Sequence, residues 1–160
     1  MTGKVPTSHL SGKLSERLAE RVRVAIIRAD YNAEITSSLE AKCFETLVAG
    51  GIPEPRIDRF VVPGCFEIPI MAQRLAQSKR YTIMIALGAV VRGDTYHFEL
   101  VADECARGVM NVSLKYDVPI VFEVLAVYHL KDAVKRAGAD GMNKGIEAAA
   151  TALALLKVLP

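Results

Sequence analysis

Thr82–Val91 reads TIMIALGAVV, and this run is the strongest indication of the fold because nearly every position in it is apolar. A strand that is apolar on both faces must be covered on both faces, as is the central strand of a parallel sheet between two helix layers. The run ends in a polar turn, Arg92-Gly93-Asp94-Thr95. We therefore predict a buried central strand followed by a loop at one edge of the sheet.

Strand and helix patterns alternate on both sides of this run. Further strands are predicted from β-branched apolar runs at 23–29, 57–62 and 119–127. Helices are predicted at 68–77, 97–116, 130–137 and 143–159, and from Ser37 to Ala49, where Ser37 and Glu40 form a capping box. This alternation predicts a three-layer α/β/α sandwich with a four-stranded parallel sheet. No linker divides residues 1–160, so we expect a single domain with an N-terminal extension over residues 1–20.

Two features near the C-terminus concern how the sheet is covered. Glu123 lies inside an otherwise apolar strand, where an unpaired buried charge would cost several kcal/mol. That strand is therefore expected at a sheet edge or against a polar channel. The last helix has no charged residue between Ala148 and Leu156, and a neighbouring subunit is the simplest cover for its second side.

The composition excludes several classes of function. With 51% hydrophobic and 24% charged residues and a net charge of +2, the chain is typical of an ordered soluble protein. No basic run interleaved with aromatic residues and no stretch of about 18 apolar residues occurs, so we expect no nucleic-acid or membrane partner, and a cytoplasmic location. The scattered Cys43, Cys65 and Cys105 lack metal-ligand spacing and are expected to be small buried side chains.

The loops after the strands carry the residues with chemical potential, because ligands of parallel α/β sheets bind at the carboxyl ends of the strands. Four motifs lie there or near the chain's end: Asp30-Tyr31-Asn32, Pro63-Gly64-Cys65-Phe66-Glu67-Ile68-Pro69, Arg92-Gly93-Asp94-Thr95-Tyr96-His97-Phe98, and Arg136-Ala137-Gly138 with Asn143-Lys144-Gly145. In this order, and over about residues 22–156, they resemble the signature of the lumazine synthase family. The resemblance implies a flavodoxin-like strand order, 2-1-3-4.

The resemblance also implies an activity and an assembly. The family condenses 5-amino-6-(ribitylamino)uracil with 3,4-dihydroxy-2-butanone 4-phosphate, which gives 6,7-dimethyl-8-ribityllumazine and releases phosphate and water. It does so without a metal or an organic cofactor, in a homo-oligomer with sites at subunit interfaces. The short segment between Arg136 and Lys144 is similar to that of members whose pentamers build sixty-subunit icosahedral shells, so a pentamer is expected and a shell is possible.

Site residues follow from the same resemblance, and their chemistry suits the roles. An aromatic ring such as Tyr31 offers a platform for a planar pyrimidine, and amides at a helix start suit an anion. A guanidinium binds phosphate through two hydrogen bonds. His97 matches the family's proton-transfer residue. The pyrimidine and ribityl contacts are Tyr31, Asn32, Phe66, Glu67, Ile68, Val90, Val91, Phe122 and Lys144, and the phosphate contacts are Gly93, Asp94, Thr95 and Arg136.

Five of these residues have a simpler alternative role. Tyr31 is alternatively a core aromatic, Glu67 a first-turn acid favoured by the helix dipole, His97 a structural histidine, and Arg136 and Lys144 solvated surface charges. Three other classes of protein remain as alternatives: a flavin carrier of the same fold, a phosphorelay receiver domain, and a shell-forming relative without catalytic activity. The loop after the first strand lacks the Ser/Thr-rich phosphate loop that a flavin carrier needs. It also lacks the clustered acids of a receiver domain.

Overall fold

The apolar central run forms β3 (Ile83–Val91), which lies inside a four-stranded sheet. It pairs in parallel with β1 (Val24–Ala29) and β4 (Ile120–Val127), and β1 pairs in parallel with β2 (Ile57–Val62). The order β2-β1-β3-β4 confirms the predicted sheet. This computed structural model describes residues 12–159, so residues 1–11 of the predicted extension and Pro160 lie outside the described part.

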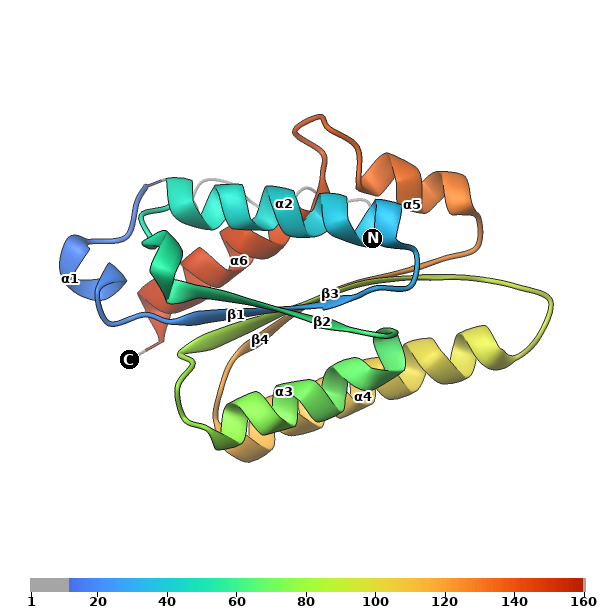
Figure 1. The fold of residues 1–160 in the computed structure, drawn as a ribbon, viewed down its shortest axis with the longest axis horizontal. Helices are drawn as coiled ribbons and strands as arrows, with labels where there is room; N and C mark the ends of the chain where they lie inside the picture. The colour runs from blue at the N-terminus through green and yellow to red at the C-terminus, as the bar shows by residue number, and fades with distance from the viewer. Residues whose placement is uncertain (1–11, 160) are drawn as a thin grey trace.

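Helices cover both faces of the sheet, which confirms the three-layer prediction (Figure 1). α2 (Ala33–Ala49), α5 (Leu130–Arg136) and α6 (Lys144–Val158) lie on one face, and α3 (Ile68–Gln77) and α4 (His97–Tyr116) lie on the other. Three short helical segments complete the fold: α1 (Glu16–Ala19), η2 (Glu54–Arg56) and η3 (Cys65–Glu67). Strand side chains alternate between two cores, so Val24 and Ile26 of β1 face α2 and α6 while Ala25 and Ile27 face α3 and α4. No helix within residues 12–159 is long and apolar enough to cross a bilayer.

The apolar C-terminal helix is packed on more than one side by its own chain, and its cover by a neighbouring subunit stays a prediction. α6 packs against α2 as well as against β3 and β4. The contact with α2 is close because Gly145 lies against the backbone of Leu39, where a Cβ atom would meet the Leu39 carbonyl oxygen. Every residue from 148 to 156 is buried or half-buried as a result. The apolar sequence of α6 thus serves packing within the chain.

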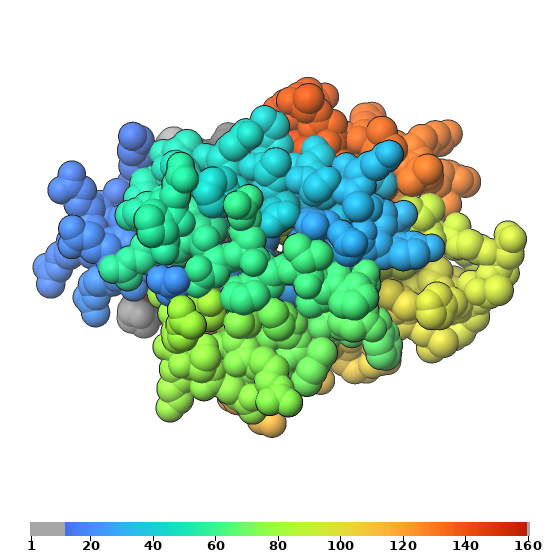
Figure 2. Space-filling model, viewed as in Figure 1, coloured from blue at the N-terminus to red at the C-terminus, as the bar shows by residue number. Residues whose placement is uncertain are grey.

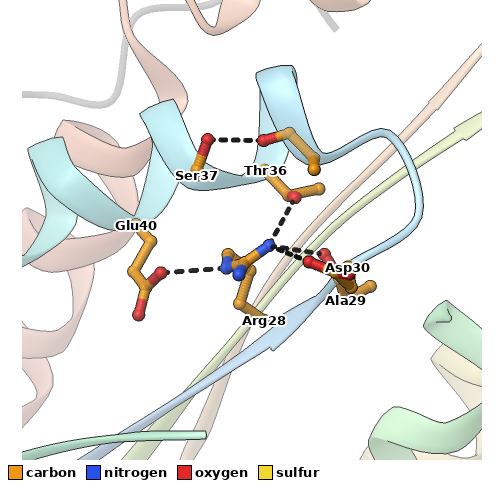
Figure 3. Close-up of polar contacts among 7 residues, drawn as sticks. Arg28, Ala29, Asp30, Thr36, Ser37 and Glu40 are labelled. Atoms are coloured by element: carbon orange, nitrogen blue, oxygen red, sulfur yellow. Dashed lines mark hydrogen bonds and ion pairs between the residues drawn. The ribbon is translucent and has the colours of Figure 1, made fainter. Parts of the chain in front are cut away.

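The start of α2 also differs from its prediction. The helix begins at Ala33, four residues before the proposed capping box, and its N-cap is Asn32 in a left-handed conformation with φ 61°. The hydroxyl of Ser37 donates to the carbonyl oxygen of Ala33 within the helix, and Glu40 accepts a hydrogen bond from Arg28 (Figure 3). The capping-box prediction was wrong because both side chains are satisfied by partners outside its local pattern.

Glu123 lies on β4, at the edge of the sheet, which confirms the edge expectation. Its side chain falls on the α2 and α6 face, between the buried Val121 and Leu125. Burial raises the pKa of the Glu123 carboxyl to about 7, with Lys144 lowering and Glu147 raising that pKa. Lys144 itself pairs with Glu147, at 2.6 Å between Nζ and Oε2.

Candidate active site

A cleft of about 780 Å³ opens at the carboxyl ends of β1, β2 and β3. Three segments far apart in the sequence form it: the loop after β1, the turn after β2, and the end of β3 with the first turns of α4. Figure 2 shows the blue, green and yellow-green surfaces of these segments side by side at one end of the molecule. Eight predicted site residues line this cleft: Tyr31, Phe66, Glu67, Val90, Val91, Gly93, Thr95 and His97.

The loop after β1 presents Tyr31 to solvent, with 73% of the residue exposed. A core role for this ring is therefore wrong. The loop backbone is held at the end of β2, because the amides of Asp30 and Tyr31 donate to the carbonyl oxygens of Val62 and Pro63 at 2.8 and 3.0 Å. The side-chain amide of Asn32 donates to the carbonyl oxygen of Ala89 at 2.8 Å. Asn32 thus connects the loop to β3 and is not among the cleft-lining residues.

The turn after β2 places Phe66 and Glu67 in the cleft but buries Ile68. Phe66 is 57% exposed, whereas Ile68 is fully buried in the core beneath α3. The amides of Glu67 and Ile68 already donate to the carbonyl oxygens of Gly64 and Cys65. Among the backbone amides of Phe66, Glu67 and Ile68, only that of Phe66 is therefore not committed in this way.

Close packing beneath this turn explains two glycines and one cysteine. A Cβ atom at Gly88 of β3 would lie 2.5 Å from the sulfur of Cys65, so the turn can approach the strand only over a glycine. At Gly64, a Cβ atom would lie 3.1 Å from a carboxylate oxygen of Glu67. Burial raises the pKa of the Cys65 thiol to about 11, which keeps it protonated at neutral pH. All three cysteines are free and buried, as predicted.

The loop between β3 and α4 carries the remaining polar lining. Gly93, Thr95 and His97 line the cleft, and Asp94 does not. His97 is the first residue of α4, so the first-turn amides of this helix lack helical acceptors and face the same end of the molecule. Phe98 and Val101 of α4 form the apolar wall of the cleft, although their helical spacing is equally typical of residues that pack a helix on a sheet. Both residues are half-buried and line the cleft, and helical periodicity cannot separate these two roles.

Besides Asn32, Ile68 and Asp94, three more predicted residues lie outside the cleft. Phe122 is 39% exposed on the edge strand β4. Arg136, in the last turn of α5, is exposed and donates to the carbonyl oxygen of Asp132 at 2.9 Å. Lys144 begins α6 and pairs with Glu147. The described part of the chain brings together no group of three His, Cys, Asp or Glu side chains that could hold a metal ion.

The fold and cleft define a class first: a flavodoxin-like α/β protein with an apolar and polar ligand cleft at the carboxyl edge of its sheet. Within that class, the family model for 6,7-dimethyl-8-ribityllumazine synthase matches residues 21–160. The chain therefore belongs to the 6,7-dimethyl-8-ribityllumazine synthase family.

Curated relatives agree with this assignment over nearly their whole length. A 6,7-dimethyl-8-ribityllumazine synthase of Xanthomonas euvesicatoria pv. vesicatoria (strain 85-10) is 47% identical over 152 residues. Proteins of the same name from Stenotrophomonas maltophilia (strain K279a) and Xylella fastidiosa (strain M12) are 44% and 45% identical. Each similarity covers 95% of this chain and 97% of the relative. Membership of this family rules out the flavin-carrier and receiver-domain alternatives.

Proposed function

We propose that this chain is a transferase of riboflavin biosynthesis, acting as a single domain over residues 1–160. It condenses 5-amino-6-(ribitylamino)uracil with 3,4-dihydroxy-2-butanone 4-phosphate to give 6,7-dimethyl-8-ribityllumazine, phosphate and water. One observation carries the proposal: Tyr31, Phe66 and His97, which come from three separate loops, line a single cleft. The family membership supplies the reaction.

The pyrimidine substrate occupies the part of the cleft between the first two loops. The exposed ring of Tyr31 stacks on the planar heterocycle, and Val90 and Val91 provide an apolar floor. The Phe66 amide donates to the pyrimidine, while the Glu67 carboxylate accepts hydrogen bonds from ribityl hydroxyls. Asn32 and Ile68 contribute by holding the loop and the turn, since one bonds to β3 and the other is buried in the core.

The phosphate of the second substrate lies at the start of α4. Gly93, Asp94 and Thr95 lead into α4, and their backbone amides donate to the phosphate oxygens. The helix dipole also favours an anion there. His97 lies in the same turn and transfers protons during imine formation, phosphate elimination and ring closure. Positioning of two reactants in one cleft supplies the larger share of the acceleration.

Phe122, Arg136 and Lys144 act in the site of an adjacent subunit. All three lie outside the cleft of their own chain, and Phe122 and Arg136 are exposed. A site shared across an interface therefore accounts for them: Arg136 binds the phosphate, and Phe122 and Lys144 complete the pyrimidine side. The protein forms pentamers in the cytoplasm, and these can assemble into a sixty-subunit shell. Neither nucleic acid nor membrane takes part.

The direct test is to incubate the purified protein with both substrates and to follow the green fluorescence of the lumazine product and the release of phosphate. Stoichiometric formation of both products is expected. A folded oligomer that forms neither product would contradict the proposal and favour the shell-forming relative without activity. Native mass measurement of the same sample distinguishes a free pentamer from a shell.

A further inference from the structure

A half-buried arginine, Arg28, joins β1 to the start of α2. Arg28 lies in β1 at a position that faces α2, next to the apolar Val24 and Ile26 on the same side of the strand. Only 12% of its side chain is exposed. Pairing stabilises a guanidinium in such a place, because an unpaired charge removed from water costs several kcal/mol.

The partners of Arg28 come from three consecutive parts of the chain (Figure 3). Its Nε donates to Glu40 of α2 at 2.9 Å. One terminal nitrogen reaches the Asp30 carboxylate at 3.0 Å, the Thr36 hydroxyl at 3.2 Å and the Ala29 carbonyl oxygen at 3.4 Å. The planar guanidinium therefore connects the strand, the following loop and the first two turns of the helix.

Tyr31 lies inside the segment that these contacts enclose. Its ring is largely exposed, so packing against neighbours does not hold it, and its position depends on the anchoring of the backbone on either side. Asn32, the next residue, adopts a left-handed conformation, which asparagine tolerates better than most non-glycine residues, and its side-chain amide bonds to Ala89 of β3. Arg28 bonds on both sides of these two residues, to Asp30 before them and to Thr36 after them.

We infer that Arg28 is a positioning residue that holds the loop after β1 so that Tyr31 presents its ring to the heteroaromatic substrate. The inference rests on the proposed function and adds to it a residue that does not touch the cleft. Its effect is selective for one substrate, because the loop that receives the phosphate is anchored elsewhere, through the Arg92 amide and the Val127 carbonyl oxygen.

The test compares Arg28→Gln and Arg28→Lys with the wild-type enzyme, with KM measured separately for each substrate. Arg28→Gln is expected to raise KM for the pyrimidine about tenfold, and KM for the butanone phosphate less than about twofold, because the platform is misplaced and the phosphate loop is not. Arg28→Lys is expected to give a pyrimidine KM between those of the wild type and Arg28→Gln, since an ammonium keeps the charge but cannot span all four acceptors. Asp30→Ala removes one exposed partner and should raise the pyrimidine KM about threefold.

Arg23→Gln is the matched control. Arg23 precedes the same strand at its other end and makes two hydrogen bonds of 2.9 Å to Asp58, so its loss also removes a paired arginine, but far from the cleft. Its KM values should equal those of the wild type. Equal kinetics of Arg28→Gln and Arg23→Gln, or equal rises in both KM values, would overturn the positioning role.

Two further readouts keep the inference separate from the proposed function. If Arg28→Gln fails to fold, Asp30→Ala decides in the same assay, and an unchanged pyrimidine KM in that variant overturns the inference. If the wild type forms no lumazine, the proposed reaction fails. Calorimetric binding of 5-amino-6-(ribitylamino)uracil then still tests the platform: weaker binding by Arg28→Gln than by Arg23→Gln supports it, and equal binding overturns it.

Discussion

His97 begins α4 with its imidazole in the cleft, where it can exchange protons with a bound ligand. We expect His97→Ala to lower kcat by about ten- to a thousandfold with little change in either KM, because proton transfer is one contribution beside positioning. Steady-state kinetics of the purified variant measure this. His129→Ala, which alters an exposed histidine outside the cleft, should behave as the wild type. Complete loss of activity in a folded His97→Ala protein would contradict this weighting.

Glu123 should make stability depend on pH. Burial raises its pKa to about 7 in the folded chain, whereas an unfolded glutamate titrates near ~4.3. Between these two pH values the folded state binds more protons than the unfolded state, so the free energy of unfolding falls as the pH rises. Lys144 and Glu147 of α6 face this carboxyl and oppose one another in their effect on its pKa.

The neutral side chain of the variant Glu123→Gln should remove this decrease in the free energy of unfolding with rising pH. We expect the variant to exceed the wild type by about 2–3 kcal/mol in unfolding free energy near pH 8, and to match it near pH 4. Urea unfolding at both pH values is the measurement. Glu34→Gln, at an exposed position of α2, serves as the control and should leave the pH dependence unchanged. A Glu123→Gln protein that loses stability with pH as the wild type does would refute the assignment.

At the scale of elements, the contact between α2 and α6 depends on one glycine. Gly145 lies against the Leu39 backbone, and its amide donates to the N-cap Asn143 at 2.8 Å. We expect Gly145→Ala to lower the free energy of unfolding by about 2–4 kcal/mol, because the added methyl group must push two helices apart. Denaturant unfolding measures the change. Gly141→Ala, where a Cβ atom has open space, should stay within about 0.5 kcal/mol of the wild type, and equal losses would refute the packing argument.

Most elements were predictable because their signals are local. β2, α3 and α4 have the predicted bounds, the other strands and α5 differ from prediction by one residue at one end, and α6 differs by one residue at each end. The start of α2 was not predictable, because Arg28 and Asn32 determine it through contacts with Glu40 and with β3. A capping motif describes only neighbours in sequence, and these partners lie on other elements.

At the scale of the whole molecule, the proposed shared site predicts complementation between two inactive variants. His97→Ala and Arg136→Ala should each be impaired in a homo-oligomer. In mixed oligomers of equal composition, about one quarter of the interfaces combine an intact His97 with an intact Arg136. Coexpression with different affinity tags and assay of the doubly purified protein tests this.

Recovery of about a quarter of the wild-type rate is the expected result. Mixing the two purified homo-oligomers without subunit exchange is the control and should give no recovery. If the mixed oligomers show only the average of the two single variants, Arg136 acts within its own chain or not at all, and the interface proposal is contradicted.

The layered fold and the loops that carry the cleft follow from local patterns in the amino-acid sequence. A run apolar on both faces requires two covering layers, and alternating strands and helices bring the loops after the strands to one edge. The strand order came from the family resemblance, and Tyr31, Phe66, Glu67 and His97 were found from their motifs and do line the cleft.

The sequence did not predict which side chains of each motif face the cleft and which face the core; these directions are seen in the folded structure. Ile68 is buried beside the exposed Phe66, Asn32 bonds to β3 beside the exposed Tyr31, and α2 packs against α6. The physical reason is that a motif specifies residue types and spacing. The direction of a side chain depends on elements that only the folded chain brings together. The same is true of the partners of a half-buried charge such as Arg28.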